Sequence, residues 1–239
     1  MVNVPVITRR ELNSLFLSPM AYVVLTGFAL AQGILFANVL EPRMDPVLTA
    51  EWITFGIPVY LLMAAAPVLT MRLLSEEASS GTIETMMTAP VTEAELVLGK
   101  FAGVLVFAMV MFLPLAAQMA FLGLHGQMDT GPALAGFMGL FLLTAQFLSI
   151  GLLCSALTRV QIAAAIMTFA ALLALYSASF MARDSQALPA RLLRYLSPPG
   201  HYTGFSQGIV DTRDVAYFVI TIALFLVLTV RALQLRKWR

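Results

Sequence analysis

The chain has 239 residues, of which 60% are hydrophobic and only 11% charged, with a mean hydropathy of +0.88 and a formal net charge of +1. Soluble domains carry about 25% charged residues, so this composition excludes a water-soluble globule and predicts a protein largely surrounded by lipid. The near-neutral charge gives no electrostatic reason to expect a nucleic-acid partner. The single cysteine, Cys154, excludes an internal disulfide and is predicted to be a small buried side chain.

The N-terminal segment 5–18 is too polar to cross a bilayer. Within it, Thr8 and Glu11 have the spacing of a capping box, and Ile7 and Leu12 are placed as the matching hydrophobic staple. The apolar residues that follow share one helical face. The segment is therefore predicted to be an amphipathic helix that starts near Thr8 and lies in the membrane interface.

Six apolar segments follow, and a transmembrane helix needs about 20 residues of this kind. Their hydrophobicity is continuous rather than alternating, which disfavours a strand barrel. The first could be mistaken for a signal peptide, but its leading region is long and contains Glu11, and its apolar run is too extended, so we predict a retained span. The predicted spans are 20–40, 53–71, 101–124, 133–157, 160–182 and 215–235.

Lysine and arginine positions predict the orientation of these spans. With the N-terminus inside, nine of them lie on the inner side and five on the outer side, which sum to the fourteen present. This bias places both termini and segment 75–97 in the cytoplasm, and segment 183–214 outside. Within the outer segment, residues 188–196 are predicted to form an amphipathic helix, and the Ser-Pro-Pro-Gly at 197–200 is predicted to turn the chain back.

The apolar cores of the spans contain no Asp, Glu, Lys, Arg or His. Ion-coupled carriers generally need such residues inside the membrane, so an energy source outside the bilayer fits this chain better. Gln32, Gln118 and Gln146 are expected to make interhelical hydrogen bonds, and lining a substrate path is the alternative. The chain also lacks a G-x-x-x-x-G-K-[ST] motif, so any ATP that drives it is bound by another chain.

An intramembrane enzyme is disfavoured, because the spans hold no paired aspartates, metal motif or serine–histidine pair. His125 and His201 fall in different predicted outer loops, which two spans separate, and each is expected to be a lone surface residue. We therefore predict no catalytic residue and no metal ligand.

The longest polar interruption runs from Ser75 to Lys100 and carries five of the thirteen carboxylates. Pro90 divides it into two short elements, and Thr92 with Glu95 forms a capping box that starts the second element, continuous with the third span. One face of the first element is predicted to carry Glu77, Ser80 and Glu84, and another Ile83, Met86 and Met87. Adaptable methionines favour a partner-binding surface, and an ordinary solvated loop is the alternative.

Beyond this element, Gly99 and Gly103 have the G-x-x-x-G spacing that lets another helix approach closely.

The same stretch resembles the motif of ABC-2-type transporter permeases, with E-E-x-x-S-G-T-I-E followed by proline-valine and V-L-G-K. The matching residues are Glu76, Glu77, Ser80, Gly81, Thr82, Ile83, Glu84, Pro90, Val91 and Val97 to Lys100. The resemblance extends over essentially the whole chain. Segments 67–77 and 201–229 further resemble the gliding-motility-associated permease subfamily, with the permease of nitrous oxide reductase copper-site maturation as a related alternative.

The resemblance implies one all-α domain over 1–239, with an N-terminal connecting helix, six spans and a cytoplasmic coupling helix between spans 2 and 3, in the bacterial inner membrane. It implies the permease subunit of an exporter that works by alternating access and is not itself an enzyme. The implied coupling residues are Glu76, Glu77, Ser80, Gly81, Thr82, Glu84, Met87 and Pro90, and those of the connecting helix are Arg9, Arg10 and Glu11.

The resemblance also implies partners. These are cytoplasmic ABC ATPase subunits that hold ATP and Mg²⁺, a second permease chain, identical or different, and an auxiliary extracytoplasmic membrane protein; this chain itself would bind no cofactor. A second hypothesis stays open, in which the chain is a non-transporting membrane anchor or mechanotransmitting scaffold for a cytoplasmic ATPase.

Overall fold

The computed structural model describes residues 3–39, 56–80, 92–124, 130–181 and 195–237, and within these ranges every regular element is a helix. The helices are α1 (Val4–Phe16), α2 (Pro19–Val39), α4 (Ile57–Thr70), α5 (Ser75–Ser79), α7 (Glu93–Val110), α8 (Phe112–Leu124), α9 (Thr130–Leu157), α10 (Gln161–Met181), α12 (Pro198–Ser206) and α13 (Thr212–Lys237). Six stretches of the described chain are long and apolar enough to cross a membrane. The prediction of an all-α membrane protein with six spans is confirmed.

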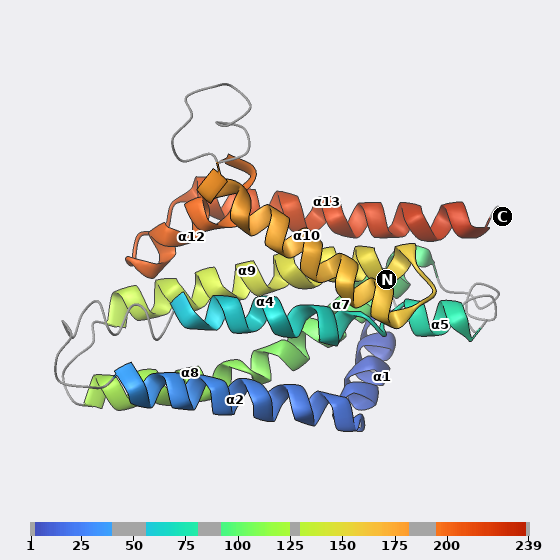
Figure 1. Cartoon of the computed structure of the whole chain (residues 1–239). Coiled ribbons are helices and arrows are strands. Elements are labelled where there is room, and N and C mark those ends of the chain that lie inside the picture. Colours follow the sequence, from blue (N-terminus) through green and yellow to red (C-terminus); the bar gives the residue numbers. More distant parts are fainter. Residues whose placement is uncertain (1–2, 40–55, 81–91, 125–129, 182–194, 238–239) are drawn as a thin grey trace.

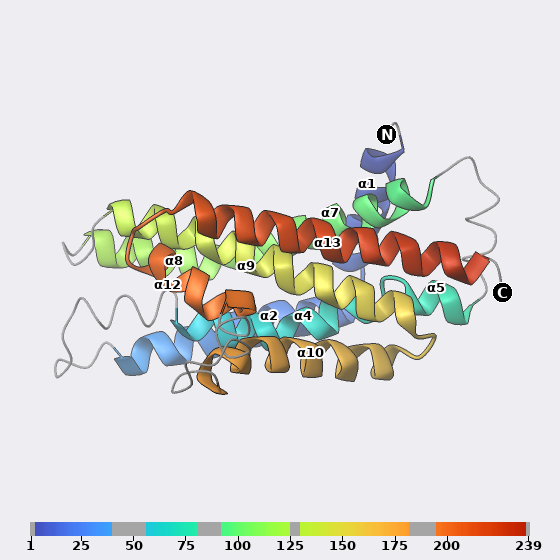
Figure 2. The same ribbon diagram turned by 90° about the horizontal axis from the view of Figure 1, so that it is seen from above.

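The long helices share one direction, and α1 lies across that direction at one end of the bundle (Figure 1). The N-terminal region, α5 and the C-terminal end of α13 gather at this same end, and α12 lies at the opposite end in both views (Figures 1 and 2). The polar elements of the chain are therefore sorted to the two ends of an apolar bundle.

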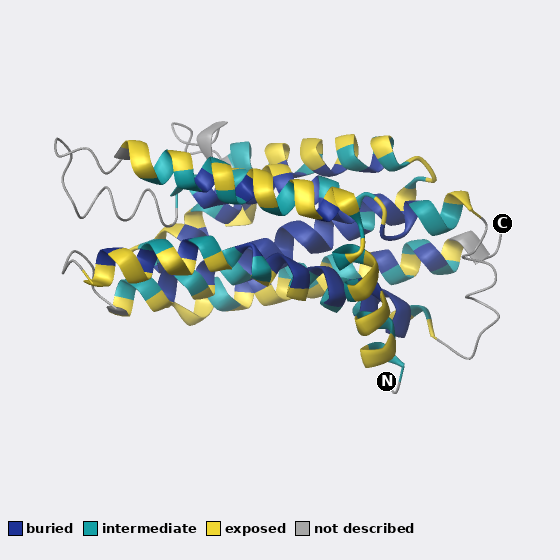
Figure 3. Ribbon diagram, turned by 90° about the horizontal axis from the view of Figure 1, so that it is seen from below, coloured by how far each residue is buried: buried dark blue, intermediate teal, exposed yellow. Residues whose placement is uncertain are grey.

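Helix α9 is the centre of the bundle and packs against α4, α7, α10, α12 and α13. Leu140, Leu143 and Leu148 on this helix are almost fully buried. Exposed residues instead follow the outward faces of the peripheral helices (Figure 3). Because lipid is as apolar as these side chains, the packing around α9 is held by close van der Waals contact more than by exclusion of water.

The third predicted span is two helices, which corrects the expectation of a single helix over 101–124. Helix α7 ends at Val110, and α8 begins at Phe112. Pro114 lacks the N–H that would bond to the Val110 carbonyl, and its ring crowds that carbonyl, so the helix breaks there. Helix α8 then runs beside α2 (Figure 1), where Gln32 Nε2 donates to Gln118 Oε1 at 3.0 Å.

Helix α1 begins at Val4, one turn before the predicted start, so the predicted Thr8–Glu11 capping box is wrong. Pro5 suits the first turn because its φ is already helical and its missing N–H would be unpaired there. Thr8, inside the helix, donates to the Val4 carbonyl at 2.9 Å and to the Gly99 carbonyl at 3.2 Å. Helix α1 thus packs directly against α7.

The two glycines of the G-x-x-x-G pattern face α1. A Cβ on Gly99 would lie 2.7 Å from Ile7 Cβ, and one on Gly103 would lie 2.8 Å from Glu11 Cβ. Such distances are well inside van der Waals contact, so glycine is what allows the two helices to touch along their backbones.

The predicted turn at 197–200 is also wrong, because Ser197 is the N-cap of α12 and residues 198–200 form its first turn. Pro198 and Pro199 occupy the first helical positions, where a missing N–H costs little. The helix ends in a Schellman motif: Gly208 has φ +83°, its N–H bonds to Phe205, and the N–H of Ile209 bonds to Gly204 at 2.8 Å. The predicted helix at 188–196 falls mostly outside the described residues.

Candidate functional site

The short helix α5 is held against α9 by one buried serine. Helix α4 ends at Thr70, and α5 begins at Ser75. Ser155 Oγ on α9 accepts hydrogen bonds from the N–H groups of Leu74 and Ser75, both at 3.1 Å, and donates to the Met71 carbonyl at 3.1 Å. Ser155 is completely buried. It therefore satisfies backbone groups that the elbow between α4 and α5 would otherwise leave without partners.

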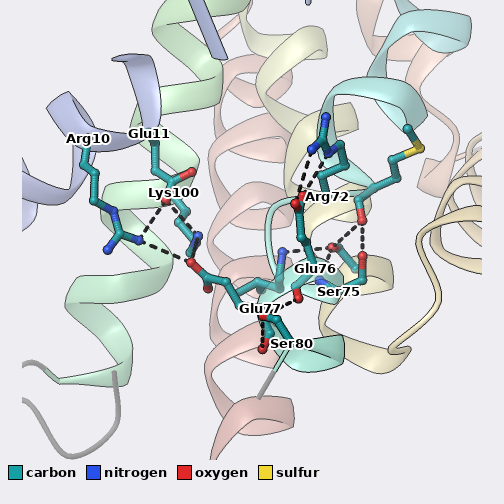
Figure 4. A network of polar contacts seen from close by, with 11 residues as sticks. Arg10, Glu11, Arg72, Ser75, Glu76, Glu77, Ser80 and Lys100 are labelled. Atoms are coloured by element: carbon teal, nitrogen blue, oxygen red, sulfur yellow. Dashed lines mark hydrogen bonds and ion pairs between the residues drawn. The ribbon is translucent and has the colours of Figure 1, made fainter. Parts of the chain in front are cut away.

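A network of ion pairs joins the other side of α5 to α1 and α7 (Figure 4). Lys100 Nζ lies 2.8 Å from Glu11 Oε1 and 2.8 Å from Glu77 Oε1. Arg10 lies 3.2 Å from the same two carboxylates. Each carboxylate is thus shared by two cations, and three elements distant in sequence meet at one point.

The network is charge-balanced, with two cations and two carboxylates. The Lys100 side chain is 2% exposed, Glu11 10% and Glu77 15%, whereas Arg10 is 53% exposed. Removing an ion of this size from water costs several kcal/mol unless partners compensate for the lost hydration. The buried lysine therefore requires both glutamates, and this requirement fixes α5 to α1 and α7.

A second ion pair lies on the exposed side of the elbow. Arg72 donates from Nε to Glu76 Oε2 at 2.8 Å and from Nη2 to Glu76 Oε1 at 3.2 Å. Between this pair and the buried network lies a cavity of about 610 Å³, bounded by the α1–α2 and α4–α5 elbows.

The start of α7 has the predicted cap. Thr92 accepts from the N–H of Glu95, and the Glu95 side chain accepts from the N–H of Thr92, both at 3.3 Å. Asn3 Nδ2 also donates to Glu95 Oε2 at 3.3 Å. The cap therefore helps to hold the first turn of α1 as well as α7.

The structure brings together Glu11, Arg10 and Glu77 of the predicted site, and places Arg9 on the exposed face of α1. Glu76 pairs with Arg72, and Ser80 bonds back to α5 carbonyls. Gly81, Thr82, Glu84, Met87 and Pro90 lie outside the described residues, as do Ile83 and Met86. Sequence reasoning did not assign Lys100 to an ion-pair network. A lysine at the entrance to an apolar span was the available signal, since such a charge needs partners.

The three glutamines lie between two different pairs of helices. Gln32 and Gln118 join α2 to α8, whereas Gln146 Nε2 on α9 donates to Thr221 Oγ1 at 2.9 Å and to Tyr217 Oη at 3.3 Å on α13. Each of the three therefore makes a hydrogen bond between helices.

His201 was expected to be a lone surface residue, and this expectation is wrong. It is 8% exposed, its Nδ1 lies 2.7 Å from Asp214 Oδ1, and its Nε2 lies 2.8 Å from the Tyr195 carbonyl. Its ring stacks on Tyr217 with centroids 4.0 Å apart. Each ring nitrogen faces an oxygen, so an N–H at either position has an acceptor. The Schellman-capped helix α12 brings His201 to α13, which sequence spacing alone did not reveal.

Replacing His201 with phenylalanine keeps the ring stack but removes both hydrogen bonds. We expect a loss of about 1–3 kcal/mol, because buried acceptors lose their donor, and faster amide hydrogen exchange in α12. Thr203→Val is the matched control, since the hydroxyl of exposed Thr203 bonds to the nearby Gly200 carbonyl of its own helix. Equal exchange in the two variants would contradict this role of His201.

These features define the class of protein: a multi-pass helical membrane protein with a polar assembly at the end where both chain ends lie. A comparison with protein families matches residues 13–238 to the ABC-2 family transporter proteins, and the chain belongs to this family. It is a membrane permease component of an ABC transporter. The match is to the family as a whole, so the gliding-motility subfamily stays a prediction. A comparison with curated proteins gave no match.

Proposed function

We propose that this permease exports its substrate by alternating access, powered by ATP hydrolysis on a separate cytoplasmic subunit that contacts segment 75–97. In this proposal α1 is the connecting helix in the membrane surface, and both termini are cytoplasmic in a bacterial inner membrane. ATP and Mg²⁺ are held by the ATPase, and this chain supplies no ligand to them.

The observation that carries the proposal is the fixing of α5 on two sides. Lys100 and Arg10 join it through Glu77 to α7 and α1, and Ser155 joins its first turn to α9. A displacement of α5 by a partner would therefore move parts of three helices together, which is the rigid-body type of transition that couples distant sites. Without these contacts, the same displacement would move the loop alone and leave the helices in place.

A second permease chain belongs to the proposal. Within the described spans, Gln32 pairs with Gln118, and Gln146 bonds to Tyr217 and Thr221, so these polar groups serve contacts inside one chain. This supports a substrate path that forms between two permease chains. The second chain is identical or different, and an auxiliary extracytoplasmic membrane protein is compatible with the arrangement.

Site-specific crosslinking tests the contact with the ATPase. Cys154 is buried, so a single introduced cysteine can be labelled selectively. Benzophenone maleimide on Ser79→Cys, an exposed position in α5, should crosslink the ATPase in the intact complex. The control is Ile209→Cys, which is exposed beside α12 at the other end of the bundle and should give no such product.

Crosslinking of the ATPase from position 209 and not from position 79 would refute the proposed orientation. The anchor or scaffold hypothesis predicts the same crosslink from position 79. It is separated from transport by reconstituting the complex in vesicles and measuring ATP-dependent accessibility of cysteines placed along the spans, which a static anchor would leave unchanged.

A further inference from the structure

A groove with a volume of about 480 Å³ lies between α9 and α13, near the chain termini (Figure 2). Two of its residues are alanines, and their small side chains leave the hollow between larger leucines. Among the described residues that line it, Arg231 is the only one with a charge. The groove therefore suits a molecule with a long apolar part and a negative end. Its apolar lining consists of Leu153, Ala156 and Leu157 on α9 and Leu228, Ala232 and Leu235 on α13.

The depth of Arg231 in the membrane limits the choice of ligand. Asp214 and Arg231 flank the uncharged part of α13, residues 215–230. At about 1.5 Å per residue, these two residues are about 25 Å apart along the helix. The hydrocarbon core of a bilayer is about 30 Å thick, so at least one of the two charges has to meet the edge of the hydrocarbon, where lipid headgroups begin.

The two flanking charges differ in the partners that the chain gives them. Asp214 Oδ1 lies 2.7 Å from His201 Nδ1. Arg231 donates from Nη1 to the uncharged side chain of Gln234 at 3.1 Å, and no carboxylate in the described part of the chain forms an ion pair with it. By contrast, both cations that line the larger cavity are paired with glutamates of the chain. The counterion of Arg231 therefore comes from outside the chain.

The charges around the groove favour a headgroup with a net negative charge. Helix α9 and residues 215–237 of α13 carry no carboxylate. Exposed Arg159, two residues beyond the end of α9, adds a second cation at the same end of the bundle. The ammonium of an ethanolamine or choline headgroup would find cations here and no carboxylate on the two helices that form the groove. A headgroup without an ammonium avoids this repulsion.

We propose that the groove binds an anionic phospholipid of the phosphatidylglycerol type, from the leaflet on the side of the chain termini. Arg231 donates to the phosphate from the guanidinium nitrogens that Gln234 leaves available, as arginine commonly does to phosphate oxygens. One acyl chain lies over Ala156 and Ala232, between the leucines of α9 and α13. The proposal does not depend on the direction of transport or on the ATPase.

Native mass spectrometry of the delipidated full chain tests the groove with phosphatidylglycerol, phosphatidylcholine and phosphatidylethanolamine that have the same acyl chains. We expect phosphatidylglycerol to be retained best. Arg231→Gln should weaken its binding by roughly tenfold, as loss of a charge-assisted hydrogen bond predicts. Arg231→Lys should lose less, because it keeps the charge. Ala232→Leu, which fills the apolar part of the groove without changing charge, should also weaken binding.

Arg159→Gln is the matched control. It removes an exposed cation from the same end of the bundle, but Arg159 does not line the groove, so phosphatidylglycerol should bind normally. The unfolding midpoint in detergent accompanies each titration, and we expect Arg231→Gln and Arg159→Gln to unfold with the wild type because both side chains are exposed. Equal weakening by these two variants would indicate diffuse attraction of anionic lipid and would overturn the proposal.

Soluble glycerophosphoglycerol and inorganic phosphate distinguish a lipid site from a site for the phosphate alone. Because the apolar lining contributes, we expect neither to displace the lipid at equal concentration, and displacement by either would contradict a lipid site. Equal retention of the three lipids, or unchanged binding in Arg231→Gln, would overturn the proposal as well. So would an intact transporter complex that retains no more phosphatidylglycerol than its Arg231→Gln form, because the groove would then be covered by a protein partner.

Discussion

Lys100→Met is expected to destabilise the folded protein by about 3–5 kcal/mol, because it leaves two largely buried carboxylates without their shared cation. The ion pairs of Glu11 and Glu77 with Arg10 would remain, but the Arg10 side chain is 53% exposed. The unfolding midpoint in detergent should fall, and α5 should exchange its amide hydrogens faster. Stimulation of the ATPase by the permease should fall with it, since α5 would lose its attachment to α1 and α7.

Two variants make this prediction specific to the charge network. Arg10→Gln removes a more exposed cation and should cost less than about 1 kcal/mol, as exposed ion pairs usually do. Neutralising the buried carboxylates as well, in Lys100→Met with Glu11→Gln and Glu77→Gln, should recover much of the lost stability, because no buried charge is then unpaired. A Lys100→Met protein as stable as the wild type would show that the network is dispensable.

Ser155→Ala is expected to uncouple the elbow from α9. It leaves the buried N–H groups of Leu74 and Ser75 without an acceptor, at a cost of about 1–3 kcal/mol for each unsatisfied group. We expect ATPase stimulation to fall severalfold while membrane insertion is retained. Hydrogen exchange should rise in residues 71–79 and stay unchanged at the far end of α9.

The chain supplies a matched control on the same helix. Ser149 is equally buried, but its hydroxyl bonds only to the Gln146 carbonyl of its own helix. Ser149→Ala should therefore leave both ATPase stimulation and exchange in residues 71–79 unaltered. If the two alanine variants behave alike, loss of a buried hydroxyl in general, and not the bonds to the elbow, explains the effect.

The sequence predicted the spans because lipid imposes a simple requirement: about 20 apolar residues in a row. It also predicted the cap at Thr92, since capping depends on side chains three residues apart. The same local pattern failed at Thr8, where Pro5 starts α1 earlier and Glu11 bonds instead to Lys100. Residue spacing shows that a side chain could form a capping box. The box does not form when that side chain instead bonds to a residue from another helix.

What the sequence by itself determined is which segments enter the membrane and which stretch of carboxylates stays outside it, because both follow from local composition. Only the tertiary structure decided the partners of those carboxylates. Glu11, Glu77 and Lys100 come from three elements, with Glu11 and Lys100 89 residues apart. Ser155 contacts Ser75, 80 residues before it. A local sequence pattern cannot predict these contacts, because they depend on how α1, α5, α7 and α9 pack together.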